Sequence, residues 1–406
     1  MGITCRSAIA VAAVLAVVST ACSSGDDDGA GPDPTTTTTT AVAAPPEQFT
    51  GSVDDFYQVP DPLPAGGPGQ LIRVQDVASA GGSTTVRVMY HSQDAAERDR
   101  AVTGIVTYPT APAPEGGWPV VSWAHGTTGV VSKCAPSRAG GAAPAFGVPG
   151  VAVATDYVGL GPVGEIHPYL SKPSEGNAVI DAVRAARNLP EAHAGTRWVS
   201  IGHSQGGHGA MSAAELAADH APELDLVGTV ALAPGSDFDK TFGAVDEVVA
   251  RVVGAIALYS APGEHPEIDP DDYAAPGLQA AADVIVDECL DAISIALAGI
   301  PAEDFYAHDP IDTEPARSLV LANDVGDVAV DAPLLLLSGT ADTTVAIDRI
   351  RSLFGRLCDA GQVTELVVVD GADHGSIIPD TEAQVTEWLT ARFADDGDPP
   401  TDSCPE

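Results

Sequence analysis

The stretch VSIGHSQGGHG, residues 199–209, decides the fold of this 406-residue chain. A short β-prone run at 198–201 leads into it, and a helix-forming stretch through Ala210 and Leu216 follows. Strand, G-x-S-x-G, helix is the context in which a serine sits on a sharp turn with its hydroxyl exposed. Because G-x-S-x-G alone is a weak signal, an ordinary turn whose Ser204 caps the helix is the alternative. The remainder of the chain has to decide between the two.

Apolar and helical segments alternate on both sides of this turn. Strands are expected at 85–88, 102–108, 120–124, 151–154, 199–201, 227–231, 334–337 and 366–369, and helices at 175–187, 207–219, 346–357 and 380–393. The early strands alternate polar and apolar residues, as antiparallel strands do. The later ones are continuous apolar runs, typical of a parallel sheet covered on both faces. This order predicts an α/β fold with a mostly parallel, doubly wound sheet.

Residues 238–327 interrupt the alternation. This segment is rich in Ala and Asp, has a helical pattern and contains no run typical of a core strand. We expect it to form a helical cap over the carboxyl edge of the sheet, where ligands bind in open α/β folds. The α/β core would then comprise residues 49–237 and 328–394, followed by an acidic tail at 395–406.

The N-terminal residues 1–21 are typical of a signal peptide, because a positive charge precedes an apolar run too short to span a membrane. Ser19-Thr20-Ala21-Cys22 resembles the lipobox of bacterial lipoproteins, in which the cysteine is lipidated. Residues 22–48 are rich in Thr, Pro and Asp, which predicts a disordered tether. We therefore predict an exported lipoprotein on the outer face of the cytoplasmic membrane, anchored only through Cys22. The alternative is a secreted protein.

The charge is strongly acidic, with 57 Asp and Glu against 18 Lys and Arg, a formal net charge of −39. Phosphate groups would be repelled, so this balance argues against nucleic acid and against anionic membrane surfaces as partners. The sequence carries no pattern that predicts an oligomeric state.

Six cysteines divide into two groups. Cys5 leaves with the signal peptide and Cys22 is the anchor candidate, whereas four remain in the exported body: Cys134, Cys289, Cys358 and Cys404. An even number in an oxidising compartment predicts two disulfides, and the residues alone leave all three pairings open. None of the cysteines has the C-x-x-C spacing of a zinc site. We expect neither a metal nor an organic cofactor.

A serine nucleophile needs a base and an orienting acid, in the chain order Ser, Asp or Glu, His for this fold. His374 lies in GADHG, directly after the strand at 366–369, and is our candidate base. The other histidines after Ser204 lie on the helix that follows it, where we expect structural roles, or in the cap (His208, His220, His265 and His308). Asp342 follows the preceding strand and is the candidate acid. Asp370 and Asp373 are its rivals.

An oxyanion hole needs two backbone N–H groups aimed at the developing negative charge. One is expected from Gln205, the residue after the nucleophile. The other is expected from Thr127 in HGTTG, residues 125–129, which follows the strand at 120–124. The alternative is a plain glycine turn with His125 as a buried structural residue.

Together these motifs resemble the secretory lipase family, α/β hydrolases similar to fungal lipase A and its actinobacterial relatives. The resemblance spans most of residues 60–394 and rests on HGTTG with CAPS at 134–137, TDYVGLG at 155–161, HPY at 167–169, GHSQGG at 202–207, APELDLVG at 221–228, SGTADTTV at 338–345 and DHG at 373–375. It implies an α/β-hydrolase fold with an inserted helical cap. It also implies a disulfide from Cys134 to Cys289 and one from Cys358 to Cys404, which would hold the tail. Fungal members carry an acidic side chain at the oxyanion loop, where this chain has His125-Gly126-Thr127.

We therefore predict a serine hydrolase, a lipase or esterase that cleaves carboxylic esters of small-molecule or lipid substrates through an acyl-serine intermediate. Catalysis would use Ser204, Asp342 and His374. A peptidase or amidase of the same fold is the first alternative. A non-catalytic envelope lipoprotein that binds acyl chains is the second.

Overall fold

The computed structural model describes residues 45–244 and 247–405. The predicted signal peptide at 1–21, Cys22 and most of the tether lie outside the described residues. Glu47–Gln48 form a short strand, β1, that pairs in parallel with the next strand. The ordered sheet therefore begins inside the segment 22–48 that composition assigns to the tether, because these last two residues find backbone partners.

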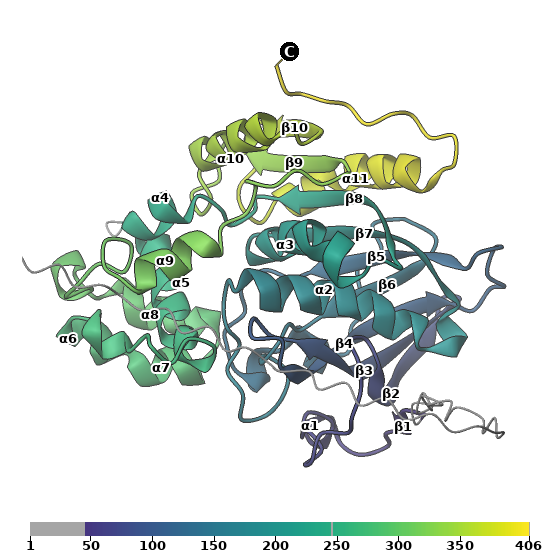
Figure 1. Ribbon diagram of the computed structural model, residues 1–406, viewed down its shortest axis with the longest axis horizontal. Helices are drawn as coiled ribbons and strands as arrows, with labels where there is room; N and C mark the ends of the chain where they lie inside the picture. The colour runs from purple at the N-terminus through teal and green to yellow at the C-terminus, as the bar shows by residue number, and fades with distance from the viewer. Residues whose placement is uncertain (1–44, 245–246, 406) are drawn as a thin grey trace, which may run out of the picture. The chain divides into compact units, whose positions relative to one another are not determined.

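A ten-stranded sheet crosses the described part of the chain, with helices on both of its faces (Figure 1). In spatial order its strands are β1 (Glu47–Gln48), β2 (Leu71–Ala80), β3 (Ser83–Gln93), β4 (Asp99–Pro109), β6 (Val151–Thr155), β5 (Trp118–Ala124), β7 (Ala194–His203), β8 (Asp225–Leu232), β9 (Leu334–Gly339) and β10 (Thr364–Val369). The six strands from β6 to β10 run parallel, while β2, β3 and β4 pair antiparallel. The sheet lies where the sequence predicts it. β2 was not predicted, because its second half is largely exposed and contains no run of large apolar residues.

Three helices cover one face of the sheet and one helix covers the other. Helices α2 (Lys172–Arg187), α3 (Gln205–His220) and α10 (Ile347–Ala360) share two buried apolar clusters with the strands. Helix α11 (Ile377–Phe393) packs with β7, β8 and β9 in a third cluster on the opposite face. The parallel strands are therefore apolar on both sides, as their continuous apolar runs require.

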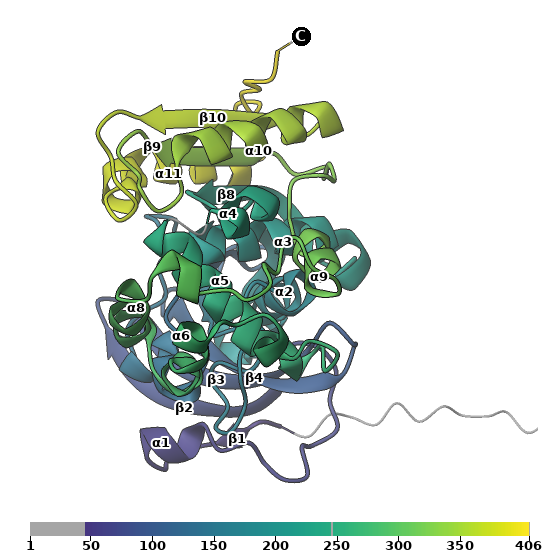
Figure 2. The ribbon, with the colours of Figure 1, turned by 90° about the vertical axis from the view of Figure 1, so that its left-hand side faces the viewer.

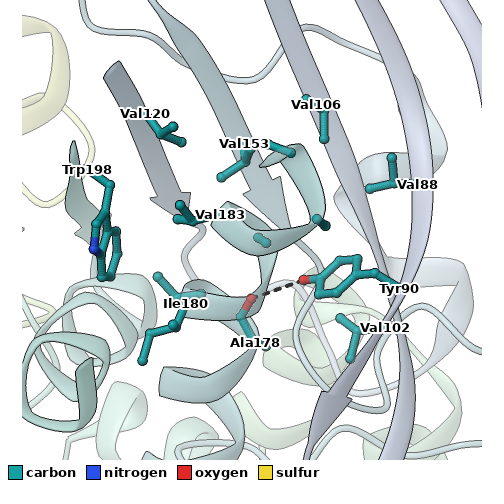
Figure 3. Packing of buried hydrophobic residues seen from close by; sticks show 14 of the residues in the cluster. Val88, Tyr90, Val102, Val106, Val120, Val153, Ala178, Ile180, Val183 and Trp198 are labelled. Atoms are coloured by element: carbon teal, nitrogen blue, oxygen red, sulfur yellow. Dashed lines mark hydrogen bonds between the residues drawn. The ribbon is translucent and has the colours of Figure 1, made fainter. Parts of the chain in front are cut away.

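The largest of these clusters joins α2 to the sheet (Figure 3). Val120 and Val153 of the strands and Ile180 of α2 are fully buried in it. Tyr90 brings a hydroxyl into this apolar region and donates it to the carbonyl oxygen of Ala178 at 3.0 Å. Burying each large apolar side chain stabilises the fold by roughly 1.5–3 kcal/mol. This packing fixes α2 against the sheet and, with it, the buried polar residues that α2 carries.

The segment between β8 and β9 folds as a set of helices beyond the carboxyl ends of the parallel strands (Figures 1 and 2). They are α4 (Phe238–Gly243), α5 (Val248–Ser260), α6 (Pro276–Gln279), α7 (Ala282–Asp287), α8 (Leu290–Ala298) and α9 (Ala316–Ala322). They share an apolar cluster that also takes in Val130, Tyr169 and Leu170 from loops of the sheet. The predicted fold class, a mostly parallel sheet with an inserted helical cap, is confirmed.

Two disulfides join distant segments: Cys134 pairs with Cys289, and Cys358 pairs with Cys404. This is the pairing that the resemblance implies. The first links the loop after β5 to the cap, and the second links α10 to the C-terminal tail. None of the helices in the described part of the chain is long and apolar enough to cross a bilayer.

Candidate active site

Ser204 occupies a strained turn between β7 and α3. Its φ of 59° and ψ of −121° are unusual for a residue with a side chain, and such strain concentrates at functional positions. Two glycines make the turn possible by close backbone approach. A Cβ atom added at Gly202 would lie 2.0 Å from the Gly206 carbonyl oxygen, and one added at Gly206 would lie 2.0 Å from that of Ala124. The Ser204 hydroxyl makes no capping hydrogen bond to α3, contrary to the helix-cap alternative.

A cavity of about 420 Å³ opens at this turn, with Ser204 and Gln205 in its wall. Phe238 and Val249 of the cap line it from the other side, and Thr344 lies on the loop that follows β9. The nucleophile candidate thus faces a space enclosed between the sheet edge and the cap, which is the position expected for a ligand site in this class of fold.

Asp342 and His374 are in direct contact. The Nδ1 atom of His374 donates to Oδ2 of Asp342 at 2.8 Å, while Oδ1 accepts from the backbone N–H groups of Thr344 (2.7 Å) and Val345 (2.8 Å). Burial disfavours the charged form of Asp342, but these hydrogen bonds outweigh it and hold its pKa below the usual value. An ionised Asp342 keeps the proton of neutral His374 on Nδ1, which leaves Nε2 free to accept one.

The two rival acids have other partners. Asp370 accepts a hydrogen bond from the hydroxyl of Thr340. Asp373 accepts from the backbone N–H groups of Gly375 and Ser376 in its own loop, and its pKa is lowered by those bonds. The structure thus brings Asp342, and neither rival, to the imidazole of His374.

His203 connects the loop that carries His374 to the strained turn at Ser204, which we call the nucleophile elbow. Its Nε2 donates to the backbone carbonyl oxygen of His374 at 2.7 Å, and the two rings lie 4.5 Å apart between centroids. Burial lowers the pKa of His203 to about 4, so its imidazole is neutral near pH 7. Because His203 immediately precedes Ser204, this contact holds His374 next to the nucleophile turn. Sequence reasoning assigned no role to His203.

The loop after β5 passes over the elbow, as the oxyanion prediction requires. A Cβ atom added at Gly126 would lie 3.6 Å from the Cβ of Ser204. The hydroxyl of Thr127 hydrogen-bonds to the hydroxyl of Tyr169 at 2.7 Å. Gln205 is the first residue of α3, so its backbone N–H is among those that have no partner within the helix. Both predicted donors therefore lie in segments that meet at Ser204.

Behind the elbow lies a buried polar cluster that sequence reasoning missed. The side chains of Glu175, His167, His208 and Gln205 are joined by hydrogen bonds and are shielded from solvent. His208 is buried, as its structural assignment predicts. A carboxylate on the buried stripe of α2 was the available signal.

A second, larger cavity lies within the cap. Its volume is about 670 Å³, and apolar side chains such as Phe242, Leu258 and Ile268 predominate in its wall. It shares Tyr169, Leu170 and Phe238 with the cavity at Ser204. An apolar space thus lies directly beyond the wall of the nucleophile site.

Metal binding has no visible basis in the described residues, where no group of three or more His, Cys, Asp or Glu side chains is placed to hold an ion. The chemistry that this arrangement supports is nucleophilic catalysis by an activated serine.

Comparison with known proteins places this chain in a family. A model of secretory lipases matches residues 148–403, more than half of the chain. The chain belongs to the secretory lipase family. Membership and the two disulfides point to an exported protein, because disulfides persist in oxidising compartments.

One relative is named a "probable inactive lipase", from Mycobacterium tuberculosis. It is 25% identical over 379 residues, which cover 86% of this chain and 84% of the relative.

Solved structures share the fold. Candida antarctica lipase A superimposes with a TM-score of 0.72 at 17% identity, covering 87% of this chain and 89% of that one. A ligand-bound form of the rice cell wall degrading esterase LipA from Xanthomonas oryzae gives a TM-score of 0.66 at 19% identity, covering 80% and 97%. These likenesses confirm the predicted α/β-hydrolase fold. The lipase family and this fold together support carboxylic ester hydrolysis.

Proposed function

We propose that this chain is an exported serine hydrolase that cleaves carboxylic esters of the acylglycerol type, with Ser204, His374 and Asp342 as its catalytic residues. The observation that carries the proposal is the 2.8 Å hydrogen bond from His374 Nδ1 to Asp342, on a loop that is tied to the elbow through His203. An imidazole held in this tautomer beside a strained serine turn is arranged to accept a proton from the serine.

The reaction follows from these positions. Ser204 Oγ attacks the ester carbonyl carbon while its proton passes to Nε2 of His374. The carbonyl oxygen becomes negative and is stabilised by the backbone N–H groups of Gln205 and Thr127. The tetrahedral species then expels the alcohol, which takes the proton from His374. Water then attacks the acyl-serine while its proton passes to His374. As this second tetrahedral species collapses, the acid leaves and His374 returns the proton to Ser204 Oγ.

The apolar cavity supports a lipid-like acyl group as the substrate. Apolar side chains predominate in its wall, and it adjoins the nucleophile cavity through Tyr169, Leu170 and Phe238. Burial of an acyl chain there would contribute roughly 0.8 kcal/mol for each methylene.

The proposed location is the outer face of the cytoplasmic membrane, through a lipid on Cys22. The lipobox-like Ser19-Thr20-Ala21-Cys22 supports it. Radiolabelled palmitate incorporated into the wild type and absent from Cys22→Ala would support this anchor, whereas an unlabelled, freely secreted wild type would contradict it.

Hydrolysis of nitrophenyl esters from acetate to palmitate tests the catalytic proposal. We expect Ser204→Ala to lose activity by several orders of magnitude, because the residue forms the covalent bond. Ser200→Ala is the matched control, since Ser200 is a buried serine on β7, the strand that leads into Ser204, and its hydroxyl donates to the Ala210 carbonyl oxygen. Its activity should stay within a few-fold of wild type.

Other outcomes assign other functions. Faster cleavage of nitroanilides than of matching esters would indicate the amidase alternative. A wild type no faster than Ser204→Ala on any ester would contradict the proposal and favour a non-catalytic protein that binds acyl chains.

A further inference from the structure

The carboxylate of Glu175 is fully buried on α2, directly behind the nucleophile elbow. Its Oε1 accepts hydrogen bonds from the side-chain amide of Gln205 at 2.7 Å and from the backbone N–H of Leu170 at 2.9 Å. Its Oε2 accepts from Nδ1 of His208 at 2.8 Å. A buried carboxylate is costly unless it is paired and hydrogen-bonded, so three donors, two from α3 and one from the loop before α2, indicate an ionised group.

His208 supplies the positive charge. Its Nδ1 faces Glu175, and its Nε2 faces the backbone carbonyl oxygen of Asn323 at 2.8 Å. Both ring nitrogens therefore face acceptors, and only the imidazolium form donates to both. Burial alone would lower the pKa of His208, but Glu175 outweighs it and raises that pKa. The pair carries no net charge, so it can lie near an oxyanion without repelling it.

The side-chain amide of Gln205 is fixed in one orientation by two acceptors. One is Glu175, and the other is Nε2 of His167 at 2.8 Å. That nitrogen is an acceptor because Nδ1 of His167 donates to the Val158 carbonyl oxygen at 2.8 Å. Both N–H bonds of the amide are thus used. Because Gln205 carries the first predicted oxyanion donor, this fixes one half of the hole.

The other half is reached through Leu170. This residue has a φ of 59°, a left-handed conformation rare outside glycine, and its N–H bond to Glu175 holds the turn. The turn places the neighbouring Tyr169, whose hydroxyl contacts that of Thr127 at 2.7 Å. Thr127 carries the second predicted oxyanion donor. One carboxylate is therefore linked to both donors, through hydrogen bonds that share its Oε1 atom.

We propose that Glu175, as an ion pair with His208, is a positioning residue that aligns both backbone donors of the oxyanion hole. This inference rests on the proposed function. The side chain of Glu175 does not line the cavity at Ser204. Its role in the reaction is therefore to position other groups and not to contact the substrate in that cavity.

The role predicts a specific kinetic change. Oxyanion donors act on the tetrahedral transition state more than on the bound ester, so misplacing them lowers kcat and leaves KM nearly unchanged. Removal of a single donor in a hydrolase costs about 10²–10³ in kcat. We expect Glu175→Gln to lower kcat by about 10²-fold, since the donors are displaced rather than removed.

Asp181→Asn is the matched control. Asp181 is a fully buried carboxylate on the same helix. Its hydrogen-bond partners are Ser92, Arg184 and His220, none of which belongs to the buried polar cluster around Glu175. Both variants neutralise a buried charge on α2, so both should lose thermal stability. We expect Asp181→Asn to keep the kcat of the wild type.

A trifluoromethyl ketone with a short alkyl chain reports on the oxyanion hole without turnover. Ser204 Oγ adds to its carbonyl carbon, the proton passes to His374, and the oxygen becomes an oxyanion. Binding should weaken about 10²-fold in Glu175→Gln and should not change in Asp181→Asn. If Glu175→Gln fails to fold, Gln205→Ala carries the test, because it keeps the backbone N–H and loses only the orienting side chain.

The outcomes separate this inference from the proposed function. An active wild type with equal kcat and equal ketone affinity in Glu175→Gln and Asp181→Asn would overturn the positioning role alone. A KM that rises by the same factor in Glu175→Gln and Asp181→Asn, with kcat unchanged in both, would also overturn the positioning role. A wild type that neither hydrolyses esters nor binds the ketone would overturn both.

Discussion

Replacing Asp342 with asparagine should invert the tautomer of His374 without moving it. Oδ1 of Asp342 accepts the backbone N–H groups of Thr344 and Val345. In Asp342→Asn the amide oxygen must occupy that position, so the amide NH2 faces His374. It then donates to Nδ1, which places the imidazole proton on Nε2. Nε2 can no longer accept the proton of Ser204.

The size of the loss distinguishes this mechanism from simple loss of a contact. A hydrogen bond to a charged group contributes about 1.5–3 kcal/mol, equivalent to roughly 10- to 150-fold in rate. An inverted tautomer in a Ser-His-Asp triad costs about 10⁴ in kcat, or about 5 kcal/mol. We therefore expect a loss near 10⁴ at neutral pH.

The assay is kcat for a nitrophenyl ester at pH 7, with thermal unfolding to show that the variant is folded. Asp373→Asn is the control, because Asp373 adjoins His374 in sequence but accepts from Gly375 and Ser376 instead. It should stay within a few-fold of wild type. The reasoning is refuted if Asp342→Asn keeps more than a tenth of kcat, or if Asp373→Asn loses as much.

Replacing Cys134 and Cys289 by serine should lower stability by about 5 kcal/mol in the chain-entropy model for a separation of 155 residues. It should also lower kcat, because the cap segment at Cys289 bridges to the loop that carries Thr127. The same change at Cys358 and Cys404 should cost about 4 kcal/mol for its separation of 46 residues and leave kcat unchanged, and equal kcat for both pairs would contradict this account. Burial raises the pKa of Asp156 to about 6, above its unfolded value near 4, so the folded state holds a proton that the unfolded chain releases between these pH values. Stability should therefore fall by about 3 kcal/mol as pH rises through this window, and urea unfolding of Asp156→Asn should lack that component; an identical pH profile for the two proteins would contradict the assignment.

Local patterns were sufficient for the architecture. Apolar runs such as 334–337 are buried on both faces, and their alternation with helical segments predicts a parallel sheet. The second half of β2 is exposed, so no apolar period marks it, and its pairing with β3 depends on residues elsewhere in the chain. The strands at the β1–β2 margin were therefore harder to predict than β10 at the other margin, which has an apolar run.

The site was predictable where chemistry leaves a local trace. A Cβ atom at Gly202 or Gly206 would lie only 2.0 Å from a backbone carbonyl oxygen. Both positions therefore require glycine, and the two glycines appear in the sequence as a motif. Glu175 leaves a fainter trace, as a carboxylate on the same helical stripe as the buried Ala178 and Val179. Its partners come from two other segments, and the sequence does not show that the three segments meet.

The disulfides show the same limit. Four cysteines permit three pairings, and no local feature of Cys134 identifies Cys289, which is 155 residues away. Resemblance to a family implied the pairing because relatives share the fold, and the fold places the two residues side by side.

The C-terminal tail has a consequence for how these molecules behave together. Strand β10 is the last in the sheet, and an uncovered outer strand offers its backbone groups to a neighbouring molecule. Ser403 occupies two of them: its N–H donates to the Thr364 carbonyl oxygen, and its hydroxyl oxygen accepts from the N–H of Leu366. The disulfide between Cys358 and Cys404 holds the segment that contains Ser403 against β10. We expect this segment to hinder β10 from pairing with a strand of a neighbouring molecule at high protein concentration.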